Sequence, residues 1–132
     1  MAYQDPFTVP RRASPLDVDI RTLTHVEDML LIEELQRAIW GYDQPYPARL
    51  LLVIAETGGQ VLGAYWQGQM IGFSFMLYAR GHGGDGPYLH SQLVGVRPAW
   101  RDKNVGFLLK LAQRPAEFFY SRRYLCKRQV LC

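Results

Sequence analysis

The residues best suited to chemistry lie where an apolar strand turns into a helix, within residues 94–109. Pro98 follows the strand, a short polar loop carries Arg101 and Lys103, and a helix then begins with Gly106 in its first turn. N–H groups at the start of a helix lack partners inside it and lie at the positive end of its dipole. With the two cations they form an anion site, whose natural ligand is a phosphate or pyrophosphate. A plain strand-to-helix connection is the alternative interpretation.

The same stretch resembles the signature of the GNAT superfamily, the acyl-CoA-dependent N-acyltransferases, which is V-x-P-x-x-R/Q-x-x-G-x-G/A. Four residues match it in place and in spacing: Val96, Pro98, Arg101 and Gly106. The resemblance covers about residues 18–114. It implies direct transfer of an acetyl group from acetyl-CoA, used as co-substrate, to the amine of a small molecule or peptide. It implies neither a covalent enzyme intermediate nor a metal.

The resemblance also implies roles for individual residues. Main-chain groups of the strand would contact the pantetheine arm, and the turn and first helical residues would cradle the pyrophosphate. The cofactor-binding residues expected on this basis are Val94, Gly95, Val96, Arg101, Asp102, Lys103, Asn104, Val105, Gly106 and Phe107. His90, on the same strand, is a candidate general base because an imidazole titrates near neutral pH. A partly buried or surface histidine without a catalytic role is the other interpretation.

Two residues of the turn depart from the family's pattern. The family's central glycine falls at Asn104, and a second position that is commonly glycine falls at Asp102. Asparagine tolerates left-handed backbone better than other non-glycine residues, so Asn104 is expected to preserve the turn. Asp102 adds a negative charge near the pyrophosphate, at a cost on the order of 1 kcal/mol. We therefore expect weakened cofactor binding.

The elements that position this segment follow from periodicity and punctuation. Residues 17–23 alternate polar and apolar, as a strand with one covered face does. Thr24 and Glu27 have the spacing of a capping box, which predicts a helix over residues 25–40. Gly41 is a fitting end for that helix. Its apolar stripe is predicted to contain Val26, Met29, Leu30, Leu35 and Ile39.

Residues 48–55 predict a short helix, with a buried strand over residues 50–55 as the alternative. Three strands are expected next, the first two joined as an antiparallel hairpin, over residues 61–66, 70–78 and 88–96. A helix then runs from Val105 to at least Arg114. This order predicts an α+β fold, with a mixed, largely antiparallel sheet flanked by helices.

The chain divides into a flexible lead-in over residues 1–15, a GNAT-like domain over residues 16–114 and a basic tail over residues 115–132. Pro115 is predicted to interrupt the last helix. In the family this helix is followed by a fifth strand, another helix and two closing strands, which the tail does not resemble. The sequence thus predicts a domain truncated after the signature helix, as a shortened or frame-shifted gene product would be.

Composition favours one globular domain, with 132 residues of which 48% are hydrophobic and 20% charged. The net charge is +3, but residues 114–132 carry +4 and the remainder −1. Nucleic-acid binding by the folded body is therefore not expected. The longest apolar run, residues 50–55, is far below the roughly 18 residues of a membrane span. Residues 1–15 have no apolar core of a secretory signal, so a cytoplasmic protein without a membrane partner is predicted.

Two functions compete with catalysis by an acetyltransferase. A truncated domain could be a non-catalytic remnant that binds CoA weakly or serves as an interaction module. Loss of the fifth strand would expose the fourth as an unpaired edge, which favours a homodimer through that edge. The second competing function is binding of a nucleic acid or an acidic partner by the tail alone, which would show a steep salt dependence.

Overall fold

A computed structural model describes residues 17–80 and 87–120, the last seven of these by their backbone only. The tail is therefore described only as far as residue 120, and the lead-in lies outside the described residues. The elements follow the order β1 (Asp19–Thr22), α1 (Val26–Trp40), α2 (Ala48–Glu56), β2 (Gln60–Trp66), β3 (Gln69–Arg80), β4 (Pro87–Val96), a 3-10 helix (Pro98–Trp100) and α3 (Val105–Tyr120).

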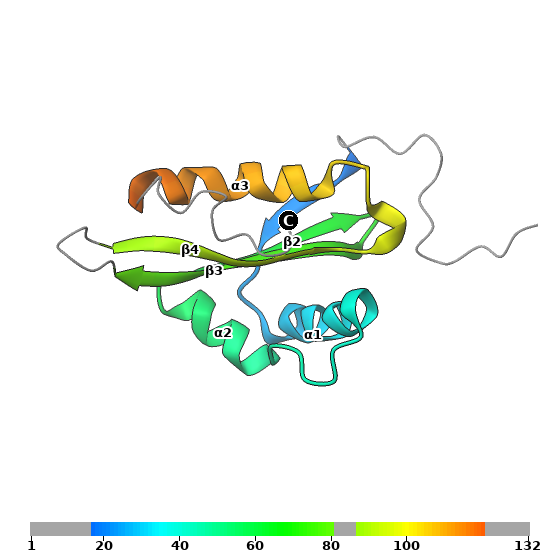
Figure 1. The fold of residues 1–132 in the computed structure, drawn as a ribbon, viewed down its shortest axis with the longest axis horizontal. Coiled ribbons are helices and arrows are strands. Elements are labelled where there is room, and N and C mark those ends of the chain that lie inside the picture. The colour runs from blue at the N-terminus through cyan, green and yellow to red at the C-terminus, as the bar shows by residue number, and fades with distance from the viewer. Residues whose placement is uncertain (1–16, 81–86, 121–132) are drawn as a thin grey trace, which may run out of the picture.

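The strands form one sheet in the order β1-β2-β3-β4. Helices α1 and α2 cover one face of this sheet and α3 covers the other (Figure 1). The α+β class and the flanking helices are confirmed. All three strand pairings among the described residues are antiparallel, which agrees with the largely antiparallel sheet predicted from the sequence.

Each face of the sheet has its own hydrophobic core. Beneath α1 and α2 the core includes Met29, Ile32, Leu35, Leu51 and the paired rings of Phe73 and Phe75. Beneath α3 a smaller core includes Ile71, Val94, Trp100, Val105 and Leu109. The alternation of side chains along each strand supplies both cores at once, which is why the strands read as nearly continuous apolar runs.

Local turn chemistry explains the hairpin between β2 and β3. Only Gln67 and Gly68 separate the strands, with φ of 48° and 80°. Two successive left-handed residues give the turn whose twist matches that of the flanking strands. The predicted hairpin is confirmed. The helix over residues 48–55 is also confirmed, because the buried residues of α2 recur with the helical period at Ala48, Leu51 and Ile54. The alternative strand is wrong.

The predicted capping box at the start of α1 is wrong. The N-cap is His25, and no side chain caps the helix there. Since the helix begins one residue later than the box requires, Glu27 occupies the second helical position, from which it cannot complete the box with Thr24. The predicted end is confirmed, with Gly41 at φ 67° and its N–H donating to the Arg37 carbonyl at 2.8 Å.

The apolar stripe of α1 is only partly as predicted. Met29 and Leu35 are buried, whereas Val26 and Leu30 are 42% and 50% exposed. The buried face is completed instead by Ile32 and Gln36, neither of which was assigned to the stripe. Gln36 is buried because it binds the main chain of the next loop, a contact that helical periodicity cannot show.

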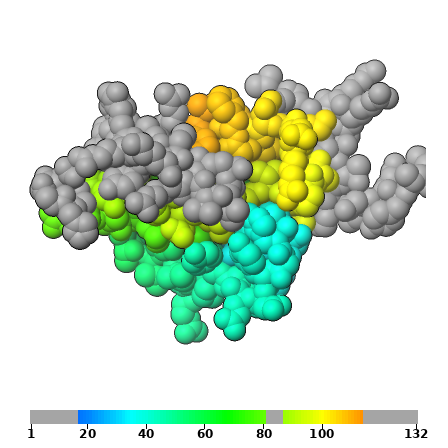
Figure 2. Space-filling view, in the orientation of Figure 1, coloured from blue at the N-terminus to red at the C-terminus, as the bar shows by residue number. Residues whose placement is uncertain are grey.

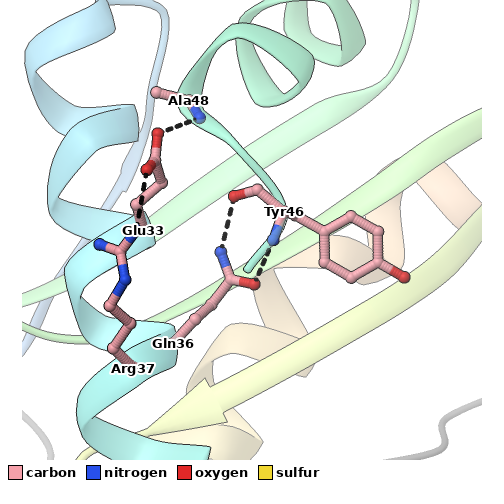
Figure 3. A network of polar contacts seen from close by, with 5 residues as sticks. All are labelled: Glu33, Gln36, Arg37, Tyr46 and Ala48. Atoms are coloured by element: carbon pink, nitrogen blue, oxygen red, sulfur yellow. Dashed lines mark hydrogen bonds and ion pairs between the residues drawn. The ribbon is translucent and has the colours of Figure 1, made fainter. Parts of the chain in front are cut away.

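The loop between α1 and α2 is held by two side chains of α1, as Figure 3 shows. The Gln36 amide donates to the Tyr46 carbonyl at 3.0 Å and accepts from the Tyr46 N–H at 2.8 Å. The Glu33 carboxylate accepts a hydrogen bond from the N–H of Ala48, the first residue of α2. Because Pro47 at the N-cap has no side-chain acceptor, Glu33 provides the cap from the preceding helix.

Helix α3 does not stop at Pro115, so the predicted interruption is wrong. The backbone stays helical through Tyr120. A proline inside a helix lacks the N–H that would bond the carbonyl four residues earlier. Pro115 therefore costs the helix one backbone hydrogen bond, and the backbone before and after it keeps helical geometry.

Candidate functional site

A groove of about 710 Å³ lies where the end of β4, the end of α1 and the start of α3 meet. In Figure 2 the surface of the turn and of early α3, in yellow, adjoins the surface of α1, in cyan. The lining residues are Ile39, Trp40, Val94, Gly95, Val96, Trp100, Arg101, Asp102, Asn104, Val105, Gly106, Phe107 and Lys110.

Gly95 lets an aromatic side chain lie against the strand. A Cβ at this position would approach both Phe73 and Trp40 to 2.7 Å, which no real side chain tolerates. The Trp40 ring packs edge-on against Phe73 at 6.0 Å and stacks on Tyr42 at 5.3 Å. The last residues of α1 are thereby fixed beside β4, where they form one wall of the groove.

The turn after β4 is anchored at both of its ends. Arg97 donates its N–H to the Ile71 carbonyl at 2.8 Å, and its Nε donates to the Met70 carbonyl at 3.0 Å. The Trp100 side chain is 2% exposed and packs against Trp66 with 5.2 Å between ring centroids. These contacts hold the turn against the sheet and determine where α3 begins.

Two left-handed residues shape the loop that enters α3. Asp102 has φ 65° and Asn104 has φ 63°. The expectation that Asn104 keeps the turn is confirmed, and Asp102 adopts the same geometry at the second departure from the family's pattern. The first bond of the helix joins the Leu108 N–H to the Asn104 carbonyl at 3.0 Å. The N–H groups of residues 105–107 therefore have no acceptor within the helix.

Gly106 leaves room at the mouth of the groove. A Cβ there would meet only the Val96 Cγ2, at 4.0 Å. Since φ at Gly106 is not positive, the glycine is required neither by backbone strain nor by crowding within the protein.

Strand β4 contains a bulge next to the groove. Phe75 pairs with Leu93 and Met76 with Ser91, so Gln92 has no partner on β3. The Gln92 amide donates to the Tyr46 hydroxyl at 3.1 Å, which links the bulge to the α1–α2 loop. The outer edge of β4 pairs with no other strand among residues 17–80 and 87–120.

Comparison with solved structures identifies this arrangement. An aminoglycoside acetyltransferase from an uncultured soil metagenomic sample superposes with a TM-score of 0.67 over 80% of this chain and 71% of its own, at 14% identity. The aminoglycoside 6'-N-acetyltransferase of Acinetobacter baumannii gives 0.61, over 79% of this chain and 74% of its own, at 14% identity. The ribosomal-protein-alanine N-acetyltransferase of Brucella melitensis biovar Abortus 2308 gives 0.60, over 78% and 73%, at 18% identity.

The chain has the GNAT fold. At these identities the likeness establishes the fold and leaves the substrate open. The sequence matches no protein-family model, and a search of curated proteins also gives no match.

The groove of this GNAT fold brings together nine of the ten residues predicted to bind the coenzyme. Lys103 is the exception, since it does not line the groove. Their role in coenzyme binding stays a prediction. His90 lies on β4, before the bulge, and pairs with Leu77 of β3. It does not line the groove. Its role as general base likewise stays a prediction.

Four lining residues were missed by sequence reasoning: Ile39, Trp40, Trp100 and Lys110. Lys110 carried a usable signal, because it follows Gly106 by four residues and so shares its face of the helix. Trp40 did not, because only the tertiary approach of α1 to Gly95 brings its ring to the groove.

A polar cluster lies between β4 and α3 at the groove. The Lys110 ammonium donates to the Ser91 hydroxyl at 2.9 Å and to the Gln113 side-chain oxygen at 3.3 Å. The Ser91 hydroxyl also donates to that oxygen, at 3.3 Å. Ser91 and Gln113 are fully buried. The Gln113 Nε2 and the Ser74 hydroxyl are buried without a hydrogen-bond partner among the described residues.

Two other kinds of site, a metal centre and a membrane span, are absent from the described residues. No group of three His, Cys, Asp or Glu side chains there could hold a metal ion. No helix in the same residues is long and apolar enough to cross a membrane.

Proposed function

We propose that this protein is an N-acetyltransferase that moves an acetyl group from acetyl-CoA directly to an amine. The observation that carries the proposal is the groove in which the end of β4 meets the open amino terminus of α3. The acetyltransferases of known structure that share the fold support acyl transfer as the class of reaction.

The coenzyme diphosphate would bind at the start of α3. Three N–H groups without helical acceptors, at residues 105–107, lie at the positive end of the helix dipole. Arg101 at the rim adds a positive charge, and the carboxylate of Asp102 opposes it. Because both Arg101 and Asp102 line the groove, the net attraction comes chiefly from the main-chain amides and the dipole.

The pantetheine arm would follow β4 toward the bulge. Residues 94–96 line the groove, and the outer edge of the strand offers main-chain N–H and C=O groups that the two amides of the arm can bond. At the bulge, the main chain of Gln92 stands outside the ladder with β3. A main-chain N–H there is a candidate donor to the oxyanion that forms when the amine attacks the thioester carbonyl.

The acceptor amine must lose a proton before or during this attack. His90, two residues before the bulge, is the candidate base, and replacement by alanine should lower the rate of transfer without changing acetyl-CoA affinity. We propose that the amine is carried by a small molecule or a peptide, in keeping with the aminoglycoside and ribosomal-protein substrates in the names of the structural neighbours. Cytoplasmic location is part of the same proposal. A homodimer through the outer edge of β4 belongs instead to the alternative, a non-catalytic interaction module, because the pantetheine arm would occupy that edge.

Calorimetric titration with acetyl-CoA, followed by thiol release over a panel of amines, tests the proposal. We expect binding, a raised melting temperature and release of CoA thiol with at least one aminoglycoside or peptide amine. Lack of binding at millimolar acetyl-CoA would contradict the proposal. Binding without release across the panel would favour a non-catalytic CoA-binding domain instead.

A further inference from the structure

Lys110 lines the groove that the donor would occupy, and its amine is bonded between Ser91 of β4 and Gln113 of α3. Lys110 and Gly106 both line the groove, four residues and about 6 Å apart along α3. The Lys110 side chain extends to Ser91 on β4, five residues or roughly 16 Å from the end of the strand at Val96. A thioester whose diphosphate is held at the start of α3, and whose arm follows β4, would therefore pass this amine.

The hydrogen bonds of Lys110 orient its nitrogen. A neutral amine has two hydrogens and one lone pair. The Ser91 hydroxyl oxygen and the Gln113 side-chain oxygen are placed to accept two hydrogens, at 2.9 Å and 3.3 Å. Both oxygens belong to fully buried side chains. These contacts hold the nitrogen between β4 and α3, and Lys110 is the member of the cluster that lines the groove.

We propose that Lys110 is a self-acylation site, at which the chain's own amine takes the acyl group from a bound acyl-CoA thioester. This inference rests on the proposed function, since it needs the donor in the groove. The Lys110 ammonium first gives a proton to solvent. Its nitrogen then attacks the thioester carbonyl carbon, the C–N bond forms and the C–S bond breaks. The departing thiolate takes a second proton from the nitrogen, which leaves N-acyl-lysine and free CoA thiol.

The buried polar groups around Lys110 suit the product of this reaction. Acylation replaces a cation by a neutral amide, which lowers the cost of its partly buried position. It also adds a carbonyl acceptor to a cluster in which the Gln113 Nε2 has no acceptor among the described residues. The cluster is therefore richer in donors than in acceptors before acylation, and less so after it.

The experiment compares the lysines of one chain with one another. The sequence contains three lysines, Lys103, Lys110 and Lys127, so peptide mass spectrometry can follow each separately. Wild-type protein is incubated with acetyl-CoA, and in parallel with the acetyl thioester of N-acetylcysteamine, which has no diphosphate. We expect acetyl-CoA to modify Lys110 at least about tenfold faster than the other two lysines, with one thiol released per chain. The short thioester should show no such preference.

Two variants complete the test. Lys110→Arg should lose the stoichiometric thiol release while its affinity for acetyl-CoA, measured by calorimetry, changes by less than about threefold. Ser91→Ala should slow the modification of Lys110 without weakening acetyl-CoA binding, because Ser91 positions the amine. Equal modification of the three lysines, or an unmodified Lys110 in a chain that binds acetyl-CoA, would overturn the inference. Absence of binding would instead overturn the proposed function, and the inference with it.

Discussion

The amino termini of α2 and α3 differ in how their main-chain N–H groups are satisfied. At α2, the Glu33 carboxylate of the neighbouring helix accepts from Ala48 and places a negative charge at the dipole. At α3, the first turn contains no acidic residue, and residues 105–107 face a groove. The same physics thus produces a closed terminus where the protein supplies its own anion and an open one where a ligand can supply it.

The largest expected effect is a loss of acetyl-CoA affinity when a carboxylate is placed in the first turn of α3. Gly106→Asp has room for its side chain, since a Cβ meets only Val96 at 4.0 Å. An acidic residue in the first turn also favours the helix, so the melting temperature should not fall. Repulsion of the diphosphate should weaken acetyl-CoA binding by about 100-fold, roughly 2.7 kcal/mol, in a calorimetric titration.

Gly106→Ala is the matched control for this charge. It adds the Cβ alone and should change acetyl-CoA affinity by less than about threefold. Equal weakening by alanine and aspartate would mean that space at Gly106, rather than the free terminus, determines binding.

The loop that leads to the closed terminus of α2 should be disrupted most directly by a substitution at Gln36. Gln36→Leu keeps the side-chain volume but leaves the N–H and C=O of Tyr46 without their partner. Loss of two partly buried hydrogen bonds should lower the free energy of unfolding by about 2 kcal/mol, measured by urea denaturation. Gln92→Leu, which removes only the half-buried bond to the Tyr46 hydroxyl, should cost less than half as much. Similar losses in the two variants would contradict a special role for the Gln36 contacts.

A smaller effect is expected from the cap itself. Glu33→Ala removes the acceptor of the Ala48 N–H and should lower the free energy of unfolding by about 1 kcal/mol. Glu33 also lies 3.6 Å from Arg37, but Arg37→Met should cost less than about 0.5 kcal/mol because the Arg37 side chain is half-exposed and the contact is a helical i,i+4 pair. If Arg37→Met costs as much as Glu33→Ala, the ion pair rather than the cap explains the stabilisation.

The smallest effect concerns pH and a residue outside both termini. Burial, and then the hydrogen bond that its phenol donates to Asp28 at 2.7 Å, raise the pKa of Tyr65 above its ordinary value near 10. The folded chain therefore keeps this proton at pH values where the unfolded chain releases it. Stability from Tyr65 should be complete below pH 10 and decline above it, and Tyr65→Phe should reduce that decline in melting temperature. If the melting temperature of Tyr65→Phe declines above pH 10 as steeply as that of the wild type, groups other than Tyr65 cause the decline.

Sequence reasoning predicted what depends on neighbouring residues. Gly41 ends α1 and Asn104 takes a left-handed turn because each requirement is local to the backbone. The capping box predicted at Thr24 is also a local feature, but it is wrong. Helix α1 begins one residue later than the box requires, so Thr24 and Glu27 do not have the positions at which their side chains could cap it. The interruption predicted at Pro115 is wrong because a proline removes one hydrogen bond of the helix, and this alone does not decide whether the helix continues.

Contacts between distant residues could not be predicted from one sequence. Glu33 caps a helix that begins fifteen residues later, and Gln92 is extruded from β4 by the register of its pairing with β3. Trp40 reaches the groove because Gly95, far along the chain, has no side chain to exclude it. The sequence signature therefore predicted the floor and mouth of the groove but not the wall formed by α1.

The most direct test of the open terminus is a titration of isotopically labelled protein with coenzyme A, followed by the backbone amide resonances. The account predicts that the amides of residues 105–107 shift most and in proportion to occupancy, whereas the amide of Ala48, already bonded to Glu33, does not. Equal shifts at both helix termini, or shifts that leave residues 105–107 unchanged while coenzyme A binds elsewhere, would contradict it.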